Sequence, residues 1–247
     1  MMKTSNPALR AKALRRPVLG LGIGEAMTVS GAVNKTAFML ILLLISASWV
    51  WNTYYTEGLA AVTPWMVIGG VGGLITALAT IFVNKWSPIT APIYAVLEGL
   101  FLGGITAIFE QKYPGLAFQA VALTFGTLFM LLMAYKVGII RATEKFKAGV
   151  VAATGGIFIV YLASFVLGLF GVRIPHIYGS GIIGIGFSVV VVVIAALNLV
   201  LDFDYIESAA REGTPKYFEW YGGFAIMVTL VWLYIEILNL LAKLRDR

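Results

Sequence analysis

Three acidic residues interrupt long apolar stretches of the chain, where a carboxylate is unexpected. Glu98 lies within YAVLEGLFLGG and Glu236 within VWLYIEILNLL, while Asp202 ends an apolar run in LNLVLDFDYIE. An ionised carboxylate at membrane depth costs several kcal/mol, so each acid needs a partner or a water-filled path. No lysine or arginine is expected at a comparable depth, which argues against internal ion pairs. Asp204 and Glu207 follow Asp202; Asp204 could border the same path, although both fit ordinary solvated loop residues.

Buried acids without a basic partner have three physical options. Two carboxyl groups that lie close together can share protons, because the second ionisation occurs beside an existing charge. Their oxygens can bind a hard cation such as Ca²⁺. Each acid can also stay protonated and form a structural hydrogen bond to a neighbouring helix. The residue pattern alone leaves all three options open.

The elements that carry these acids are expected to be transmembrane helices. Of 247 residues, 60% are apolar and 12% are charged, and the apolar residues form uninterrupted runs. A membrane-spanning helix needs about 20 apolar residues, whereas a membrane-spanning strand is about half as long and alternates. Seven runs meet the helix criterion: Thr36–Tyr54, Pro64–Phe82, Ala91–Phe109, Leu116–Tyr135, Gly149–Val172, Ser180–Leu201 and Tyr221–Leu241. The sequence therefore predicts an all-α integral membrane protein with seven transmembrane helices.

Glycine spacing predicts where these helices pack closely. Gly69 and Gly73 lie four residues apart, as do Gly99 and Gly103. This spacing places two residues without side chains on one helix face, so that a neighbouring backbone can approach.

Polar segments divide the chain into a basic tail at 1–35 and a membrane domain at 36–247. The other polar stretches are Lys136–Lys147 and Asp202–Trp220. Lysine and arginine resist translocation, and most of them fall on one side if the N-terminus is cytoplasmic. The exception is Lys243–Arg247, so the last run either crosses fully or re-enters; full crossing is favoured.

Composition also excludes several classes of protein. The net charge of +6 is explained by cations that set topology and contact anionic lipid head groups, so no nucleic-acid partner is expected. The chain has no cysteine, which excludes disulfides and thiol chemistry. It lacks a zinc-ligand pattern and a serine–histidine arrangement, so neither enzymatic activity nor a cofactor is expected.

At the acidic residues, the sequence resembles the Bax inhibitor-1 family, whose members contain the transmembrane Bax inhibitor motif. The stretch Leu201–Ile206 (LDFDYI) is similar to the family's tyrosine-aspartate motif at the end of span six. Leu233–Glu236 (LYIE), followed by Asn239–Leu240, is similar to its leucine-tyrosine-leucine-aspartate run. Met27–Thr36 resembles a bacterial branch, which implies a bacterial plasma membrane. The resemblance extends over the whole membrane region.

The resemblance implies that Asp202 and Glu236 form a pH-responsive carboxyl pair that gates a passive Ca²⁺ leak. Glutamate replaces the family's aspartate at Glu236, and the interval between the two acids is longer than in compact members. Both departures bear on the geometry of the pair. Glu98 has no counterpart in the family motifs, and we expect it to line the same path.

We therefore expect a seven-helix protein with a central C-terminal helix that lets Ca²⁺ leak under proton control. One rival is a proton-coupled secondary transporter, which would use broken helices and inverted repeats near the membrane centre. A second rival is a regulatory scaffold that binds other membrane proteins and does not need the buried acids. All three functions require contact with the lipid bilayer, and the first two involve protons.

Overall fold

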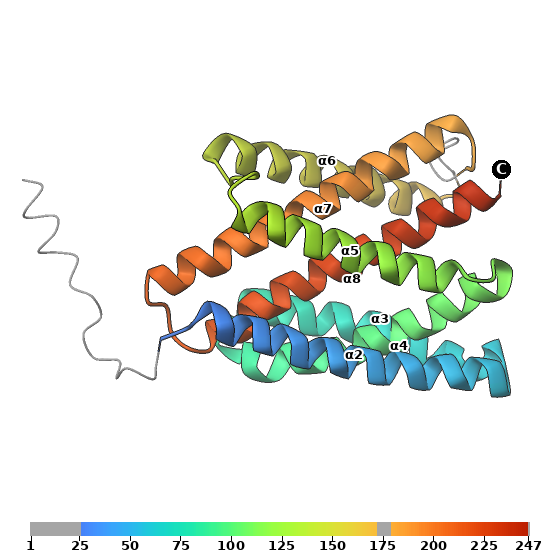
Figure 1. Cartoon of the computed structure of the whole chain (residues 1–247). Coiled ribbons are helices and arrows are strands. Elements are labelled where there is room, and N and C mark those ends of the chain that lie inside the picture. Colours follow the sequence, from blue (N-terminus) through green and yellow to red (C-terminus); the bar gives the residue numbers. More distant parts are fainter. Residues whose placement is uncertain (1–25, 172–178, 247) are drawn as a thin grey trace, which may run out of the picture.

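A computed structural model describes residues 26–171 and 179–246, which fold as an up-and-down bundle of long helices (Figure 1). The helices are α2 (Val29–Glu57), α3 (Leu59–Phe82), α4 (Ser87–Lys112), α5 (Leu116–Lys136), α6 (Glu144–Leu169), α7 (Ile182–Arg211) and α8 (Phe218–Arg245), with a 3₁₀ turn η1 (Asn84–Trp86). In this part of the chain, seven helices are long and apolar enough to cross a membrane. Each overlaps one predicted run, so the predicted all-α, seven-helix architecture is confirmed.

The length of helix α8 bears on whether the last apolar run crosses the membrane or re-enters it. It is a single helix of 28 residues. At about 1.5 Å per residue it is longer than the hydrocarbon core of a bilayer, which is about 30 Å thick. An unbroken helix of this length favours full crossing over re-entry. The two ends of α8 therefore lie on opposite sides of the bundle.

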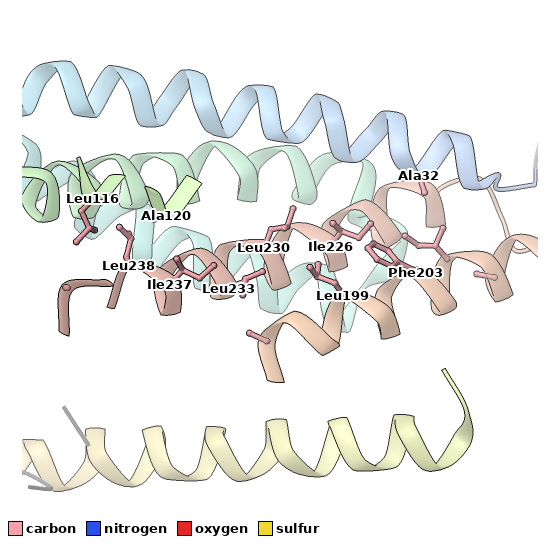
Figure 2. Close-up of a cluster of buried hydrophobic side chains, with 14 of the residues drawn as sticks. Ala32, Leu116, Ala120, Leu199, Phe203, Ile226, Leu230, Leu233, Ile237 and Leu238 are labelled. Carbon is pink, nitrogen blue, oxygen red and sulfur yellow. The ribbon is translucent and has the colours of Figure 1, made fainter. Parts of the chain in front are cut away.

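The core of the bundle is built around α8. This helix packs against α2, α4, α5 and α7 and has the largest buried share of any described helix. Figure 2 shows the main apolar cluster, in which Leu230 and Leu233 of α8 lie near Leu199 of α7, while Leu238 lies beside Leu116 of α5. The C-terminal helix is therefore central, as expected.

Helix α6 lies at the edge of the bundle, on the side away from α2, α3 and α4 (Figure 1). It packs mainly against α7, and only Val150 and Ile157 are buried along its length. Large side chains such as Phe158 and Phe165 are about two-thirds exposed and face the lipid. Apolar packing therefore contributes little to holding α6 in place.

Two helix boundaries differ from the sequence prediction. Helix α2 begins at Val29, capped by the Thr28 side chain, about two turns before the predicted end of the basic tail; the tail up to residue 25 lies outside the described residues. Helix α7 continues to Arg211, through half of the segment that was expected to be a loop. Phe203, Ile206 and Ala209 are buried there, and this helical spacing of apolar residues explains the extension.

The predicted glycine contacts join α2, α3 and α4 into a tight layer. A Cβ at Gly99 would overlap Ser46 and the Leu43 backbone of α2, and one at Gly103 would overlap the Ala47 backbone. Gly69 of α3 faces the α4 backbone at Leu97 in the same way. The predicted close packing at these glycines is confirmed.

A buried carboxylate that the sequence did not single out fastens α8 to the start of α2. Glu219 is 2% exposed, and its Oε1 accepts hydrogen bonds from the backbone N–H and the hydroxyl of Thr28, both at 3.1 Å. Gly31 lies directly against this carboxylate, where a Cβ would overlap it. A negative charge at a helix N-terminus also compensates the helix dipole.

Replacing Gly31 with alanine is expected to destabilise the protein by about 1–3 kcal/mol, because the new methyl group displaces Glu219 from Thr28. The matched control is Gly155→Ala, a helical glycine with open space around it, where alanine should be neutral or slightly stabilising. Thermal unfolding of both variants in detergent checks this. Equal midpoints for the two variants would mean that the Glu219 contact contributes nothing to stability.

Candidate functional site

Glu236 lies at the edge of a polar cavity between four helices, at the end of the bundle where α8 ends. The cavity has a volume of about 600 Å³, and its lining comes from α4, α6, α7, α8 and the residue after α8. Lys112, Glu236, Asn239, Lys243 and Asp246 are among the lining residues. A space of this size with several polar groups can hold water.

The Glu236 side chain is 4% exposed and is held by two donors. The Tyr161 hydroxyl of α6 donates a 2.8 Å hydrogen bond to Oε1, and Trp232 Nε1 donates to the same atom at 3.2 Å. Both donors suit an ionised carboxylate, and neither bond uses Oε2. The arrangement fixes the orientation of the carboxyl group while its second oxygen keeps its lone pairs.

Asp202 has a different environment, on the same helix pair. Its carboxyl group lies beside the Thr229 side chain of α8. One oxygen of this group, Oδ2, is buried without a hydrogen-bond partner among the described residues. A buried polar atom without a partner is destabilising, and such atoms are rare in folded proteins.

The structure does not bring Asp202 and Glu236 into direct contact. Antiparallel α7 and α8 place Asp202 beside Thr229 and Ser188 beside Lys243, which is one constant register. Glu236 lies seven residues beyond Thr229, or about 10 Å along the helix. This geometry differs from the shared-proton pair that the resemblance implies.

Apolar side chains separate the two acids. Leu199 of α7 and Leu233 of α8 lie at intermediate positions along the two helices, and both are fully buried in the main cluster (Figure 2). The water-accessible cavity is lined by Glu236 but not by Asp202. In this conformation, a polar path along α7 and α8 is interrupted between the two carboxyl groups.

Asp204 and Glu207 lie on helix α7 and not in a solvated loop. Asp204 forms a 2.8 Å ion pair with Lys147 of α6. Glu207 accepts a 2.7 Å hydrogen bond from the Tyr135 hydroxyl of α5 and pairs with Arg211 at 3.7 Å. These contacts lie at the end of the bundle opposite the cavity.

Helix α6 is attached to the bundle by polar groups at seven-residue intervals. Lys147 binds Asp204, the Thr154 hydroxyl accepts a 2.8 Å hydrogen bond from Asn198 Nδ2, and Tyr161 binds Glu236. Residues seven apart lie on nearly the same face of a helix. Together with Asp202, Thr229, Ser188 and Lys243, these groups form a polar seam between α6, α7 and α8.

Glu98 lies apart from this polar seam. Its side chain lies beside Tyr94, one turn earlier on α4, and against Gly73 of α3. Tyr94 in turn packs edge-on against Phe224, with ring centroids 5.0 Å apart. The structure therefore separates Glu98 from the other two acids, and the expected common path is not seen.

Comparison with known proteins bears on the whole chain. The family model described as Bax inhibitor 1 like matches residues 3–246. The chain belongs to the Bax inhibitor 1 like family. Neither a curated protein nor a solved structure matches it.

Three residues at the site of this Bax inhibitor 1 like protein were missed by sequence reasoning. Tyr161 is one of many aromatic residues in apolar runs, and only its contact with Glu236 sets it apart. Lys243 was assigned to an outer basic tail, but it reaches into the bundle and donates to Ser188 Oγ at 2.8 Å. The seven-residue spacing from Glu236 to Lys243 was the available signal, since it places both on one helix face.

Asp246 is the third missed residue and lies at the mouth of the cavity, just after α8. The Tyr113 hydroxyl donates a hydrogen bond to it, and Lys112 forms a 3.5 Å ion pair with it. The hydrogen bond from Tyr113, aided by the Lys112 charge, holds the pKa of Asp246 below its usual value. In this Bax inhibitor 1 like protein, the mouth therefore keeps one carboxylate ionised even in mildly acidic medium.

Proposed function

We propose that this protein is a passive cation leak channel of a bacterial plasma membrane, with its N-terminus in the cytoplasm. Ca²⁺ is the permeant ion, and proton binding at Glu236 controls its access. The observation that carries the proposal is the polar cavity that reaches a buried carboxylate at membrane depth. With this orientation, the cavity opens toward the outside of the cell.

The polar seam supports a path for ions across the membrane. Ionisable and polar residues are rare within spans and mark ion paths more often than they stabilise packing. Here they follow one line between α6, α7 and α8, from Lys147 and Asp204 at one end to Lys243 and Asp246 at the other. The other side of the bundle is joined mainly by glycine contacts and apolar clusters.

The ligand chemistry favours a hard cation that binds weakly. The cavity offers oxygen atoms from Glu236, Asn239, Ser188 and Tyr161, and carboxylate, amide and hydroxyl oxygens suit Ca²⁺. Within the described residues, no group of three or more His, Cys, Asp or Glu side chains lies together. We therefore propose a site that an ion visits during passage and not a resident metal centre.

Protons and Ca²⁺ must compete at such a site. Deprotonated Glu236 offers the cation a negative charge, whereas protonated Glu236 offers none. The competition is reciprocal, so acid should weaken Ca²⁺ binding and Ca²⁺ should favour the ionised carboxylate. Leu199 and Leu233 close the path in the present conformation, and opening requires that these side chains separate.

Ca²⁺ influx into proteoliposomes at several pH values tests the proposal, together with Ca²⁺ binding to purified protein. Influx should run down the Ca²⁺ gradient and change with pH, and binding should weaken in acid. Accumulation of Ca²⁺ against its gradient under an imposed pH gradient would favour the proton-coupled transporter. Binding that is independent of pH, with no influx, would favour the scaffold.

A further inference from the structure

Lys243 lies inside the cavity that leads to Glu236, on the same face of α8. Its ammonium group donates hydrogen bonds to Ser188 Oγ at 2.8 Å and to the Gly184 carbonyl oxygen at 3.2 Å, both on α7. Ser188 is only 2% exposed. The charge is therefore anchored on the wall of the cavity and does not extend freely into the solvent.

Among the described residues, the charged groups that line the cavity alternate in sign along its length. Asp246 lies at the mouth, where Lys112 of α4 pairs with it at 3.5 Å. Lys243 follows, and Glu236 lies two turns deeper on α8. The cavity lining that α6 and α7 contribute is uncharged and consists of Tyr161, Phe187 and Ser188. A cation that enters from the mouth thus passes a positive charge before it reaches Glu236.

The Lys243 charge acts on the same space as Glu236. The two groups interact electrostatically, and the protein around them is less polarisable than water, which strengthens such interactions. By Coulomb's law, a fixed positive charge repels a divalent cation twice as strongly as a monovalent cation at the same position. Its effect therefore depends on the valence of the ion.

We propose that Lys243 is a specificity-determining residue that lowers the passage of divalent cations relative to monovalent cations. Gly184 and Ser188 hold its ammonium group at the wall of the cavity, so that the charge is fixed but the space stays open. The inference rests on the proposed cation leak and adds to it a residue that limits Ca²⁺ passage. Removing the charge then increases Ca²⁺ passage more than K⁺ passage.

Fluxes of ⁴⁵Ca²⁺ and ⁸⁶Rb⁺, a K⁺ substitute, are compared in proteoliposomes with wild type, Lys243→Gln, Lys243→Arg and Lys145→Gln. The Lys243→Gln variant should raise the ratio of Ca²⁺ to Rb⁺ flux by about tenfold, because the repulsion that it removes is larger for the divalent ion. Lys243→Arg keeps the charge and should keep the ratio. Lys145→Gln is the matched control, because Lys145 is exposed at the start of α6 and does not line the cavity, so that solvent screens its charge. An unchanged ratio in Lys243→Gln, with flux retained, would overturn the proposal.

A second variant and a second measurement cover the case in which Lys243→Gln does not fold. Ser188→Ala removes one anchor of the ammonium group and should raise the flux ratio by about two- to threefold; an unchanged ratio counts against the proposal. Binding of Mn²⁺, a divalent probe, to detergent-solubilised protein should tighten in Lys243→Gln, and unchanged affinity would reject the role of Lys243. If wild type passes neither ion, the leak itself is rejected, and the Mn²⁺ measurement alone decides whether Lys243 disfavours divalent ions.

Discussion

Replacing Glu236 with glutamine is expected to reduce Ca²⁺ passage by at least about tenfold and to remove most of its pH dependence. Glutamine has nearly the same shape, and its carbonyl oxygen can still accept the hydrogen bonds from Tyr161 and Trp232. It lacks the negative charge and the titratable proton. The loss is therefore attributed to the charge, because the packing of α8 against its neighbours is kept.

Glu98→Gln is the matched control for this experiment. Glu98 is also an acid in the middle of a span, but it lies beside Tyr94 and does not line the cavity that reaches Glu236. It should change Ca²⁺ flux by less than about twofold, since no charge on the proposed path is lost. Equal losses in both variants would mean that any buried acid is needed for folding and that Glu236 has no special role.

Asp202→Asn and the double variant then separate the two acids. Glu236 lies about 10 Å along α8 from the level of Asp202. Over such a spacing the two carboxyl groups interact through their charges, but they do not share one hydrogen bond. We expect each replacement to have its own effect on the pH profile, with weaker coupling than in a directly bonded pair. If the double variant is no worse than either single variant, the helices must bring the two acids together in another conformation.

Replacing Leu233 with alanine is expected to destabilise the protein by about 2–5 kcal/mol and to raise Ca²⁺ flux in the closed state. Leu233 is fully buried in the main cluster, and Leu199 is the equally buried residue on the facing helix (Figure 2). The smaller side chain removes packing contacts and leaves space between Glu236 and Asp202, which water can enter beside polar groups. Because the path then no longer closes fully, the Ca²⁺ flux should depend less on pH.

Leu74→Ala is the control, because Leu74 of α3 is 60% exposed to the lipid. Shortening this side chain removes little packing within the protein, so the stability and the Ca²⁺ flux should both stay nearly unchanged. Thermal unfolding in detergent reports the stability, and Ca²⁺ influx at two pH values reports the leak. A large loss of stability with unchanged influx would assign Leu233 a packing role only and move the closed point of the path elsewhere.

The number of helices and their character could be predicted from sequence, because a span needs a long apolar run and seven such runs are present. The glycine contacts could be predicted for a similar reason, since a four-residue glycine spacing has one main structural use. The end of α7 was not predicted, because Asp204, Glu207 and Arg211 look like loop residues. The helical spacing of Phe203, Ile206 and Ala209 was the signal that was overlooked. The contacts of the acids with Lys147 and Tyr135 come from other helices and could not be predicted.

The candidate site was predictable in its acids but not in their arrangement. A carboxylate in an apolar run is visible in the sequence, and this singled out Glu98, Asp202 and Glu236. Which acids line the same cavity depends on the register of α7 against α8. A shift of two turns along the helix would change which acids lie together. Glu219 was missed because it lies in a polar segment, where nothing distinguishes a buried carboxylate from a solvated one.

The central position of α8 has a consequence for synthesis of the protein. This helix follows the other six described helices in the chain, so it is the last of them to leave the ribosome. Until it arrives, Tyr161, Ser188 and Asp202 lack the groups on α8 that they contact in the finished bundle. The nascent chain therefore passes through a stage in which these polar side chains face lipid or one another. The time between the synthesis of α7 and the synthesis of α8 sets how long these polar groups remain without their partners on α8.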